Sequence, residues 1–146
     1  IGAAVASERV AAGFAPGSHA STFGGNPLAT AAGLAALETI LEEGVLENCR
    51  RIGGYLREGL ERMALRHPGL VREVRGRGLL QAMDLTVAGG PIVESCMGRG
   101  LLINCTANTV LRFLPPLIVT TEEVDEMLET LESVLASTPG EGGDVS

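Results

Sequence analysis

The sequence predicts an α/β fold, and three observations carry this prediction. Two long stretches, roughly over 27–42 and 45–66, have the composition or apolar spacing of helices. From residue 70 onward, short alternating stretches punctuated by glycine are typical of β-strands. Thr120-Thr-Glu-Glu is a capping box that opens a last helix. Helices and strands that alternate along one chain favour a layered α/β architecture.

Length and charge limit the classes of partner. The chain has 146 residues, about the length of one domain. Its 18 acidic and 11 basic side chains leave a net charge of −7, so neither nucleic acid nor an anionic membrane surface is an expected partner. No apolar run approaches the length of a membrane span. The 3 cysteines have no metal-like spacing, which predicts free thiols, no metal site and a reducing, cytoplasmic compartment.

The composition of the first forty residues predicts buried elements. Residues 1–6 are small and apolar, which predicts the end of a buried strand, and 7–13 form a short amphipathic patch. Asn26-Pro27 is a strong helix start, with Asn as the N-cap and Pro at the first helical position. The helix over 27–42 is apolar on nearly every side, so we expect it to be buried against a core or another subunit.

The helix over 45–66 is amphipathic. Its apolar residues recur at spacings of 3 and 4, which places them on one helical face: Val45, Cys49, Ile52, Leu56, Leu60 and Met63. Gly53-Gly54 weakens the prediction, because glycine in a helix interior costs about 1 kcal/mol relative to alanine. Pro68-Gly69 ends the helix.

The remaining elements are shorter. Strands are expected from residue 70, best around 79–85, and again at 101–103 and 110–114. A short helix over 91–99 is opened by Pro91, and the last helix presents an apolar face of Val124, Leu128, Leu131 and Leu135.

These elements divide the chain into three parts. Residues 1–44 lack visible strand partners, 45–137 can form a small α/β unit, and 138–146 are expected to be a disordered tail. The chain begins at Ile1, which we interpret as a fragment boundary. All 11 basic residues are arginine, so no lysine amine is available for covalent catalysis.

The loop over 17–26 is the first candidate site. It leads into a helix, so its backbone N–H groups and the helix dipole suit a phosphate, and Ser21 and Thr22 add hydroxyl donors. The alternative is an ordinary turn in which these hydroxyls bond the local backbone, and composition alone favours that turn.

Arg112 is the second candidate. It is the single charge in an apolar strand, on the face opposite Leu111 and Phe113. A guanidinium in such surroundings needs a carboxylate or phosphate, which it can grip with two hydrogen bonds. A structural ion pair or a solvent-facing strand edge would explain it equally well.

The other polar residues suggest ordinary roles. We interpret His19 as a hydrogen-bonding loop residue and His67 as a helix C-terminal cap. Asp84 has no evident partner of opposite charge, and the arginines at 72, 75 and 77 are interpreted as a solvated surface. The cysteines lack a nearby base and are treated as small apolar residues.

Two strings resemble a known family. His19-Ala-Ser-Thr-Phe-Gly-Gly-Asn-Pro and Thr109-Val-Leu-Arg-Phe-Leu-Pro-Pro together resemble the class III (ornithine-type) aminotransferases, and the resemblance covers residues 1–137. It implies the C-terminal part of a fold-type I transferase dependent on pyridoxal 5′-phosphate. Residues 1–44 would be the end of its large cofactor-binding domain at the dimer interface, and 45–137 its small domain.

The resemblance also implies roles for three residues. Thr22, with Ser21 beside it, matches the residue that reaches the cofactor phosphate of the neighbouring subunit, which implies a homodimer with shared active sites. Arg112 matches the arginine that holds the α-carboxylate of a small amino-acid substrate. The members most similar in these strings transfer an amino group between N-acetylornithine and 2-oxoglutarate, in arginine biosynthesis.

One departure from the family pattern is serious. The Schiff-base lysine of the family should lie just before Ile1, and this chain contains no lysine. We therefore expect no transamination by the chain alone. The alternatives are another member of the family, acting on ornithine or 4-aminobutyrate, and a non-catalytic domain that stands alone.

Overall fold

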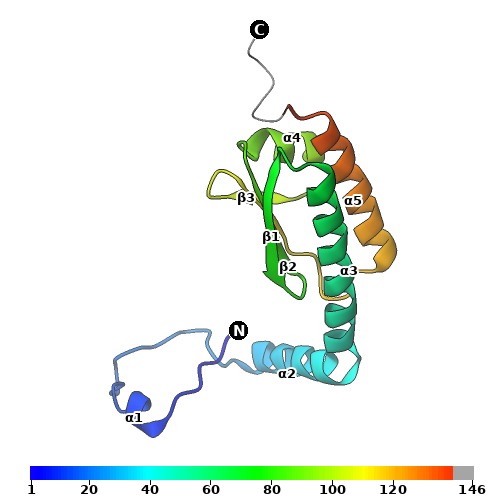
Figure 1. Cartoon of the computed structure of the whole chain (residues 1–146). Coiled ribbons are helices and arrows are strands. Elements are labelled where there is room, and N and C mark those ends of the chain that lie inside the picture. The colour runs from blue at the N-terminus through cyan, green and yellow to red at the C-terminus, as the bar shows by residue number, and fades with distance from the viewer. Residues whose placement is uncertain (140–146) are drawn as a thin grey trace. The chain divides into compact units, whose positions relative to one another are not determined.

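The computed structural model describes residues 1–139, and Figure 1 shows their elements. The chain divides into two compact units, Ile1–Gly44 and a second unit that begins at Val45. The interpretation of these units as the end of a large cofactor domain and a small domain stays a prediction.

The first unit contains two helices, α1 (Glu8–Ala11) and α2 (Pro27–Glu42), and no strand among residues 1–44. The strand expected at residues 1–6 is therefore wrong. A strand is stabilised by backbone hydrogen bonds to a neighbour, and this unit offers none. The chain at 1–6 is exposed throughout.

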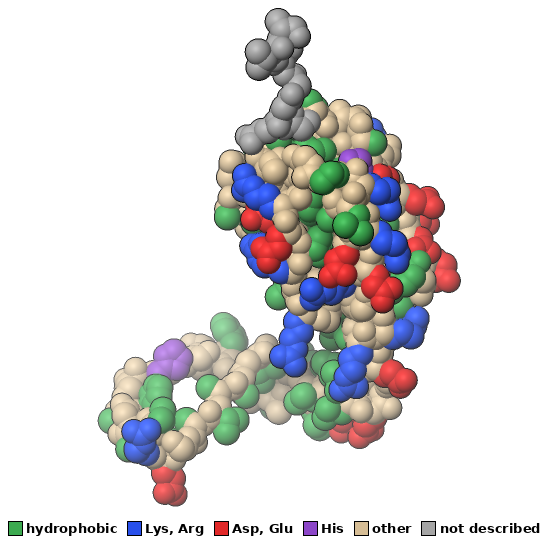
Figure 2. Space-filling model, viewed as in Figure 1, with side chains coloured by type: hydrophobic (Ala, Val, Ile, Leu, Met, Phe, Trp, Pro, Cys, Tyr) green, Lys and Arg blue, Asp and Glu red, His purple; other side chains and the backbone are tan. Residues whose placement is uncertain are grey.

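Helix α2 begins where the sequence predicts. The side chain of Asn26 caps it by accepting a hydrogen bond from the Ala29 N–H at 3.0 Å, and Pro27 occupies the first turn. The expected burial of this helix is not met within the chain, because Leu28 is 83% exposed and no residue of 1–44 is buried. Figure 2 shows the hydrophobic side chains at the surface of this unit. Several large apolar side chains of α2 are exposed, namely Leu28, Leu34, Leu37 and Leu41, and such exposure on one helix is typical of an interaction face.

The second unit is built on a four-stranded sheet in which every neighbouring pair is antiparallel, in the order β1-β2-β4-β3. The strands are β1 (Val71–Arg77), β2 (Leu80–Leu85), β3 (Asn104–Thr106) and β4 (Val110–Phe113). Three helices accompany them: α3 (Val45–Arg66), α4 (Gly90–Met97) and α5 (Thr121–Ala136). Helix α3 packs on β1, β2 and α5, and α4 packs on β3 and α5. An α/β fold is confirmed.

The core lies between the helices and one face of the sheet. The predicted apolar face of α3 is confirmed, because Ile52, Leu56, Leu60 and Met63 are fully buried. Alternate strand residues meet this face, among them Met83, Leu85 and Leu111. The residues between them face the other way, so the sheet has one covered face and one open face.

One predicted strand is displaced. The strand expected at 101–103 is wrong, and β3 forms at Asn104–Thr106 instead. Ala107 and Asn108 both have positive φ, the conformation of a tight hairpin turn, and this turn pairs Asn104 with Arg112. Pairing cannot extend far beyond, because β4 runs into Pro115-Pro116, which lack the backbone N–H that a ladder needs.

Helix α5 has the predicted capping box. The Thr120 hydroxyl accepts from the Glu123 N–H, and the Glu123 carboxylate accepts from the Thr120 N–H. At the other end the expected disorder does not begin at Thr138, because this residue donates its N–H and its hydroxyl to carbonyls of the last turn. The rest of the predicted disordered tail, from residue 140, lies outside the described residues. Within residues 1–139 no helix combines the length and the apolarity needed to cross a membrane.

A polar clamp joins the ends of α3 and α5. Arg66 Nη2 lies 2.6 Å from Glu132 Oε2, and His67 Nε2 lies 2.8 Å from Glu132 Oε1. His67 directly follows the last residue of α3, and its backbone N–H donates to the carbonyl of Met63, as expected for a helix C-terminal cap. In addition, its ring contacts the neighbouring helix. The hydrogen bond from Arg66, helped by that from His67, holds the pKa of Glu132 below its ordinary value.

This clamp predicts a loss of stability in acid. The folded state lowers the pKa of Glu132. Its contribution to the free energy of unfolding is therefore complete at a pH above the pKa of the unfolded state, near 4.5, and disappears as the pH falls through the pKa of the folded state. The pair is partly exposed, so we expect at most about 1 kcal/mol. Urea unfolding at pH 7 and pH 3 should show a smaller pH effect for Glu132→Gln than for the native chain. An equal pH effect in both would contradict this assignment.

Candidate functional site

Arg112 lies on the open face of the sheet, in β4. Its neighbours Leu111 and Phe113 are buried on the helix side, while Arg112 is exposed. The strand alternation inferred from the sequence is therefore confirmed. Among residues 1–139, Arg112 takes part in no ion pair and donates no side-chain hydrogen bond. Its guanidinium fork is free to bind a carboxylate from outside the chain.

Arg112 borders a pocket in the second unit. The pocket has a volume of about 590 Å³ and is lined by the segments 101–103, 112–116 and 118–120, by Leu56 of α3 and by side chains of α5. Most of its lining is apolar, with Arg112, Thr120 and Glu123 as the polar members. Small-molecule sites usually combine an apolar wall with a few polar groups that fix orientation.

The N-terminal turns of α3 hold the wall of this pocket in place. The side-chain amide of Asn48 donates to the carbonyls of Leu117 and Val119, at 3.0 and 3.1 Å. Arg51 in turn donates to Asn48 Oδ1 at 2.9 Å, which orients the amide. The segment that follows β4 is therefore anchored by a side chain 69 to 71 residues away in sequence.

The loop over 17–26 presents free donors. Ser21 Oγ accepts a hydrogen bond from the Gly24 N–H at 3.1 Å, which leaves its own O–H available to donate. Among the described residues, neither the hydroxyl nor the N–H of Thr22 forms a hydrogen bond. Gly25 adopts a positive φ of 68° and directs the chain into the Asn26 cap.

These donors suit a phosphate. Ser21 and Thr22 lie on one exposed turn just before the N-terminus of the 16-residue helix α2, where the helix dipole favours negative charge. Hydroxyl and N–H groups are the donors that phosphate oxygens need. The residues of this loop therefore fit the phosphate of a cofactor such as pyridoxal phosphate. His19 stays in its ordinary role: it is an exposed residue of the same loop.

The structure brings together some predicted residues and not others. Ser21 and Thr22 share a turn in the first unit, while Arg112 belongs to the second. The three cysteines are free thiols, as expected, and burial raises the pKa of the Cys96 thiol, which makes it a packing residue. Among residues 1–139 no cluster of His, Cys, Asp and Glu could hold a metal ion.

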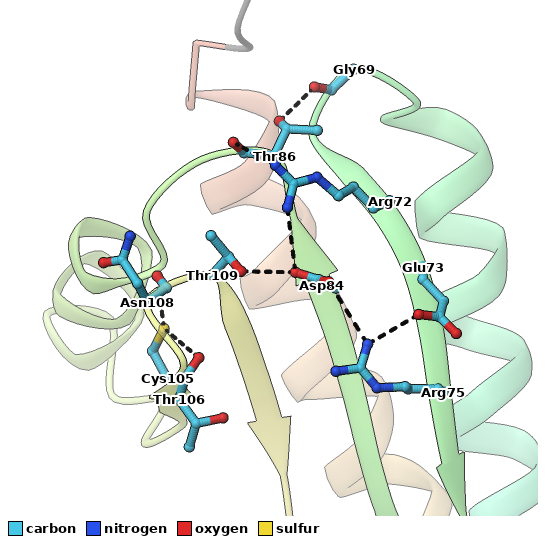
Figure 3. A network of polar contacts seen from close by, with 10 residues as sticks. All are labelled: Gly69, Arg72, Glu73, Arg75, Asp84, Thr86, Cys105, Thr106, Asn108 and Thr109. Carbon is cyan, nitrogen blue, oxygen red and sulfur yellow. Dashed lines mark hydrogen bonds and ion pairs between the residues drawn. The ribbon is translucent and has the colours of Figure 1, made fainter.

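Sequence reasoning missed a polar network on the open face of the sheet. Asp84, which we interpreted as isolated, contacts Arg72, Arg75 and Thr109 (Figure 3). Arg72 and Arg75 are exposed, as the interpretation of a solvated surface predicts, and in addition they pair with this carboxylate. The available signal was the short hairpin between β1 and β2, which brings two charged strands side by side.

Comparison with known proteins identifies the family. The model of the class-III aminotransferase family matches residues 1–135. Acetylornithine aminotransferase of Caldanaerobacter subterraneus is 50% identical over 93% of this chain, and ornithine aminotransferase of Bordetella pertussis is 44% identical over all of it. The chain spans about a third of these relatives, 34% and 36% of their lengths.

Solved structures agree with this assignment. The match to acetylornithine aminotransferase from Elizabethkingia anophelis covers 86% of this chain and 32% of that protein, with a TM-score of 0.77 and 31% identity. The match to ornithine δ-aminotransferase of Plasmodium falciparum covers 90% of this chain and 35% of that protein, with a TM-score of 0.82 and 32% identity. The chain therefore belongs to the class III aminotransferase family.

Proposed function

We propose that this chain supplies the C-terminal part of an enzyme that moves an amino group between N-acetylornithine and 2-oxoglutarate. The observation that carries the proposal is Arg112, an exposed guanidinium without an ion-pair partner in the described chain, beside a pocket. 2-Oxoglutarate carries a carboxylate next to its reacting carbon, and the two hydrogen bonds of Arg112 would orient that carbon. N-acetylornithine reacts at its terminal amine, because the acetyl group blocks its α-amine. A cytoplasmic location and a role in arginine biosynthesis belong to the same proposal.

The proposed cofactor is pyridoxal 5′-phosphate. When bound, it carries the amino group and withdraws electrons from the reacting carbon. Ser21 and Thr22 would donate hydrogen bonds to its phosphate, and the N-terminus of α2 would add its partial positive charge. We further propose that this phosphate belongs to the active site of a second subunit, since the apolar surface of the first unit needs a covering partner.

The chain by itself is expected to be inactive. It contains 11 arginines and no lysine, and the family's reaction requires a lysine amine that bonds the cofactor and moves the proton. Incubation of the chain with pyridoxal phosphate, N-acetylornithine and 2-oxoglutarate should yield no glutamate. Glutamate formed at a steady rate by the chain alone would contradict this prediction.

The choice of amino donor is tested in a complex with a lysine-containing N-terminal portion of the family. We expect kcat/KM for N-acetylornithine to exceed the values for ornithine and for 4-aminobutyrate. A preference for ornithine would support the ornithine-specific alternative and leave the role of Arg112 intact. A preference for 4-aminobutyrate would contradict the proposed amino donor.

A further inference from the structure

The open face of the sheet holds two carboxylates that stand directly opposite each other. Glu73 of β1 is the cross-strand partner of Asp84 of β2. Like charges in this arrangement destabilise a sheet. Arg75 lies between them, with Nη1 3.1 Å from Glu73 Oε2 and 3.8 Å from Asp84 Oδ2 (Figure 3). One guanidinium therefore bridges both carboxylates.

Two further groups engage Asp84. Thr109 donates its hydroxyl to Asp84 Oδ1 at 2.8 Å, and Arg72 Nη1 lies 4.0 Å from the same oxygen. Arg72 reaches this position from a bulge in β1, between Val71 and Glu73, and also donates to the carbonyl of Thr86. Both oxygens of the Asp84 carboxylate are thus occupied by groups of the same chain (Figure 3).

Arg112 shares this face with Asp84. Ala82 pairs with Arg112 and Asp84 with Val110, so Asp84 and Arg112 are diagonal neighbours on adjacent strands. Such neighbours lie about 7–8 Å apart, within reach of an arginine side chain. Yet the ion pairs of Asp84 in the described chain are to Arg72 and Arg75, and Arg112 has none.

The charges on this face explain why. Glu73 and Asp84 carry two negative charges, which Arg72 and Arg75 balance. Arg112 and Arg77 are the positive charges on this face that no carboxylate of the described residues balances. An arginine that paired with Asp84 would have to break that pair before it could grip a substrate carboxylate, and its apparent affinity would fall by the fraction of time it is free.

We propose that Arg72 and Arg75 are positioning residues that keep Asp84 away from Arg112 and so leave Arg112 free for the substrate carboxylate. This inference rests on the proposed function of Arg112. It assigns a role to a polar network that includes none of the residues proposed to bind the cofactor or the substrate. Without Arg72 and Arg75, Asp84 becomes a competitor of the substrate within the same chain.

The first test needs no ligand and uses the full chain. The coupling between Asp84→Asn and Arg112→Gln is measured by urea unfolding, once in the native background and once with Arg72→Gln and Arg75→Gln. We expect almost no coupling in the native background. In the double-Gln background, a cross-strand pair should change the unfolding constant by about three- to fivefold. Equal coupling in the two backgrounds would overturn the proposal.

The second test measures carboxylate binding at Arg112 directly. The side-chain Nε–Hε signal of Arg112 is assigned in the NMR spectrum of the full chain by its loss in Arg112→Lys, and glutarate is titrated as a carboxylate probe. Replacing Arg72 and Arg75 with glutamine should weaken glutarate binding about three- to fivefold. Adding Asp84→Asn should restore it, because the amide carries no charge to compete.

Arg77→Gln is the matched control. It removes one positive charge from the same strand and the same face as Arg75, and Arg77 forms no ion pair within residues 1–139. A loss of affinity as large with this control, unrelieved by Asp84→Asn, would show a general charge effect and overturn the proposal. If the Arg112 signal does not respond to glutarate even in the native chain, the role of Arg112 in the proposed function is wrong. The unfolding cycle alone then tests whether Arg72 and Arg75 keep Asp84 from pairing with Arg112.

Discussion

Replacing Gly53 with alanine is expected to destabilise the second unit by about 3 kcal/mol. Gly53 lies in the middle of α3, where its buried face touches the turn between β1 and β2. A Cβ at this position would stand 2.5 Å from the carbonyl carbon of Gly78 and 2.6 Å from its oxygen. These are backbone atoms, so the whole turn would have to move.

The turn has little freedom to move. Gly78 has a positive φ of 55°, and its carbonyl accepts a hydrogen bond at 2.7 Å from the side chain of Gln81, which is 1% exposed. The glycine that weakens the helix prediction for 45–66 is therefore explained by a close approach of two backbones.

Gly54→Ala provides the matched control for Gly53→Ala. It makes the same chemical change one residue along the same helix, where an added Cβ would meet nothing within 4 Å. Because alanine is the better helix former, we expect Gly54→Ala to stabilise the chain by up to about 1 kcal/mol. Urea unfolding of both variants checks the pair. Stability changes of the same sign and size would contradict the packing argument.

Replacing Arg112 with alanine is expected to lower kcat/KM by about 10² to 10³ in a complex with a lysine-containing N-terminal portion, the range expected when a paired charge loses its partner. Arg112→Lys keeps the charge but loses the planar fork, so its activity should fall between that of the native enzyme and that of the alanine variant. The same kinetics for Arg77→Ala should match the native enzyme. A normal kcat/KM for Arg112→Ala would remove Arg112 from the substrate site.

The helices were predictable because their signals are local. The N-cap pair Asn26-Pro27 and the capping box at Thr120 each involve residues that are near neighbours in sequence, and both helices begin as expected. Strand pairing is not local in this way. The strand expected at 101–103 is displaced to Asn104–Thr106 because the register is set by a turn and by its partner β4.

The candidate site was predictable only in part. Strand alternation placed Arg112 on the correct face, but its freedom from ion pairs depends on Arg72 and Arg75, on a strand that is not its neighbour. Asp84 looked isolated because its partners lie up to 25 residues away in sequence. Residue types alone indicated the donors of Ser21 and Thr22, while the burial expected for α2 is not met among the described residues.

Reconstitution tests whether this chain supplies part of an aminotransferase. The chain is mixed with a separately expressed, lysine-containing N-terminal portion, and glutamate formation from N-acetylornithine and 2-oxoglutarate is followed. We expect conversion in the mixture, none with either part alone, and a loss of about 10² or more when the mixture contains Arg112→Ala. A stable complex of the two parts that forms no glutamate would contradict the proposed function and favour a non-catalytic domain.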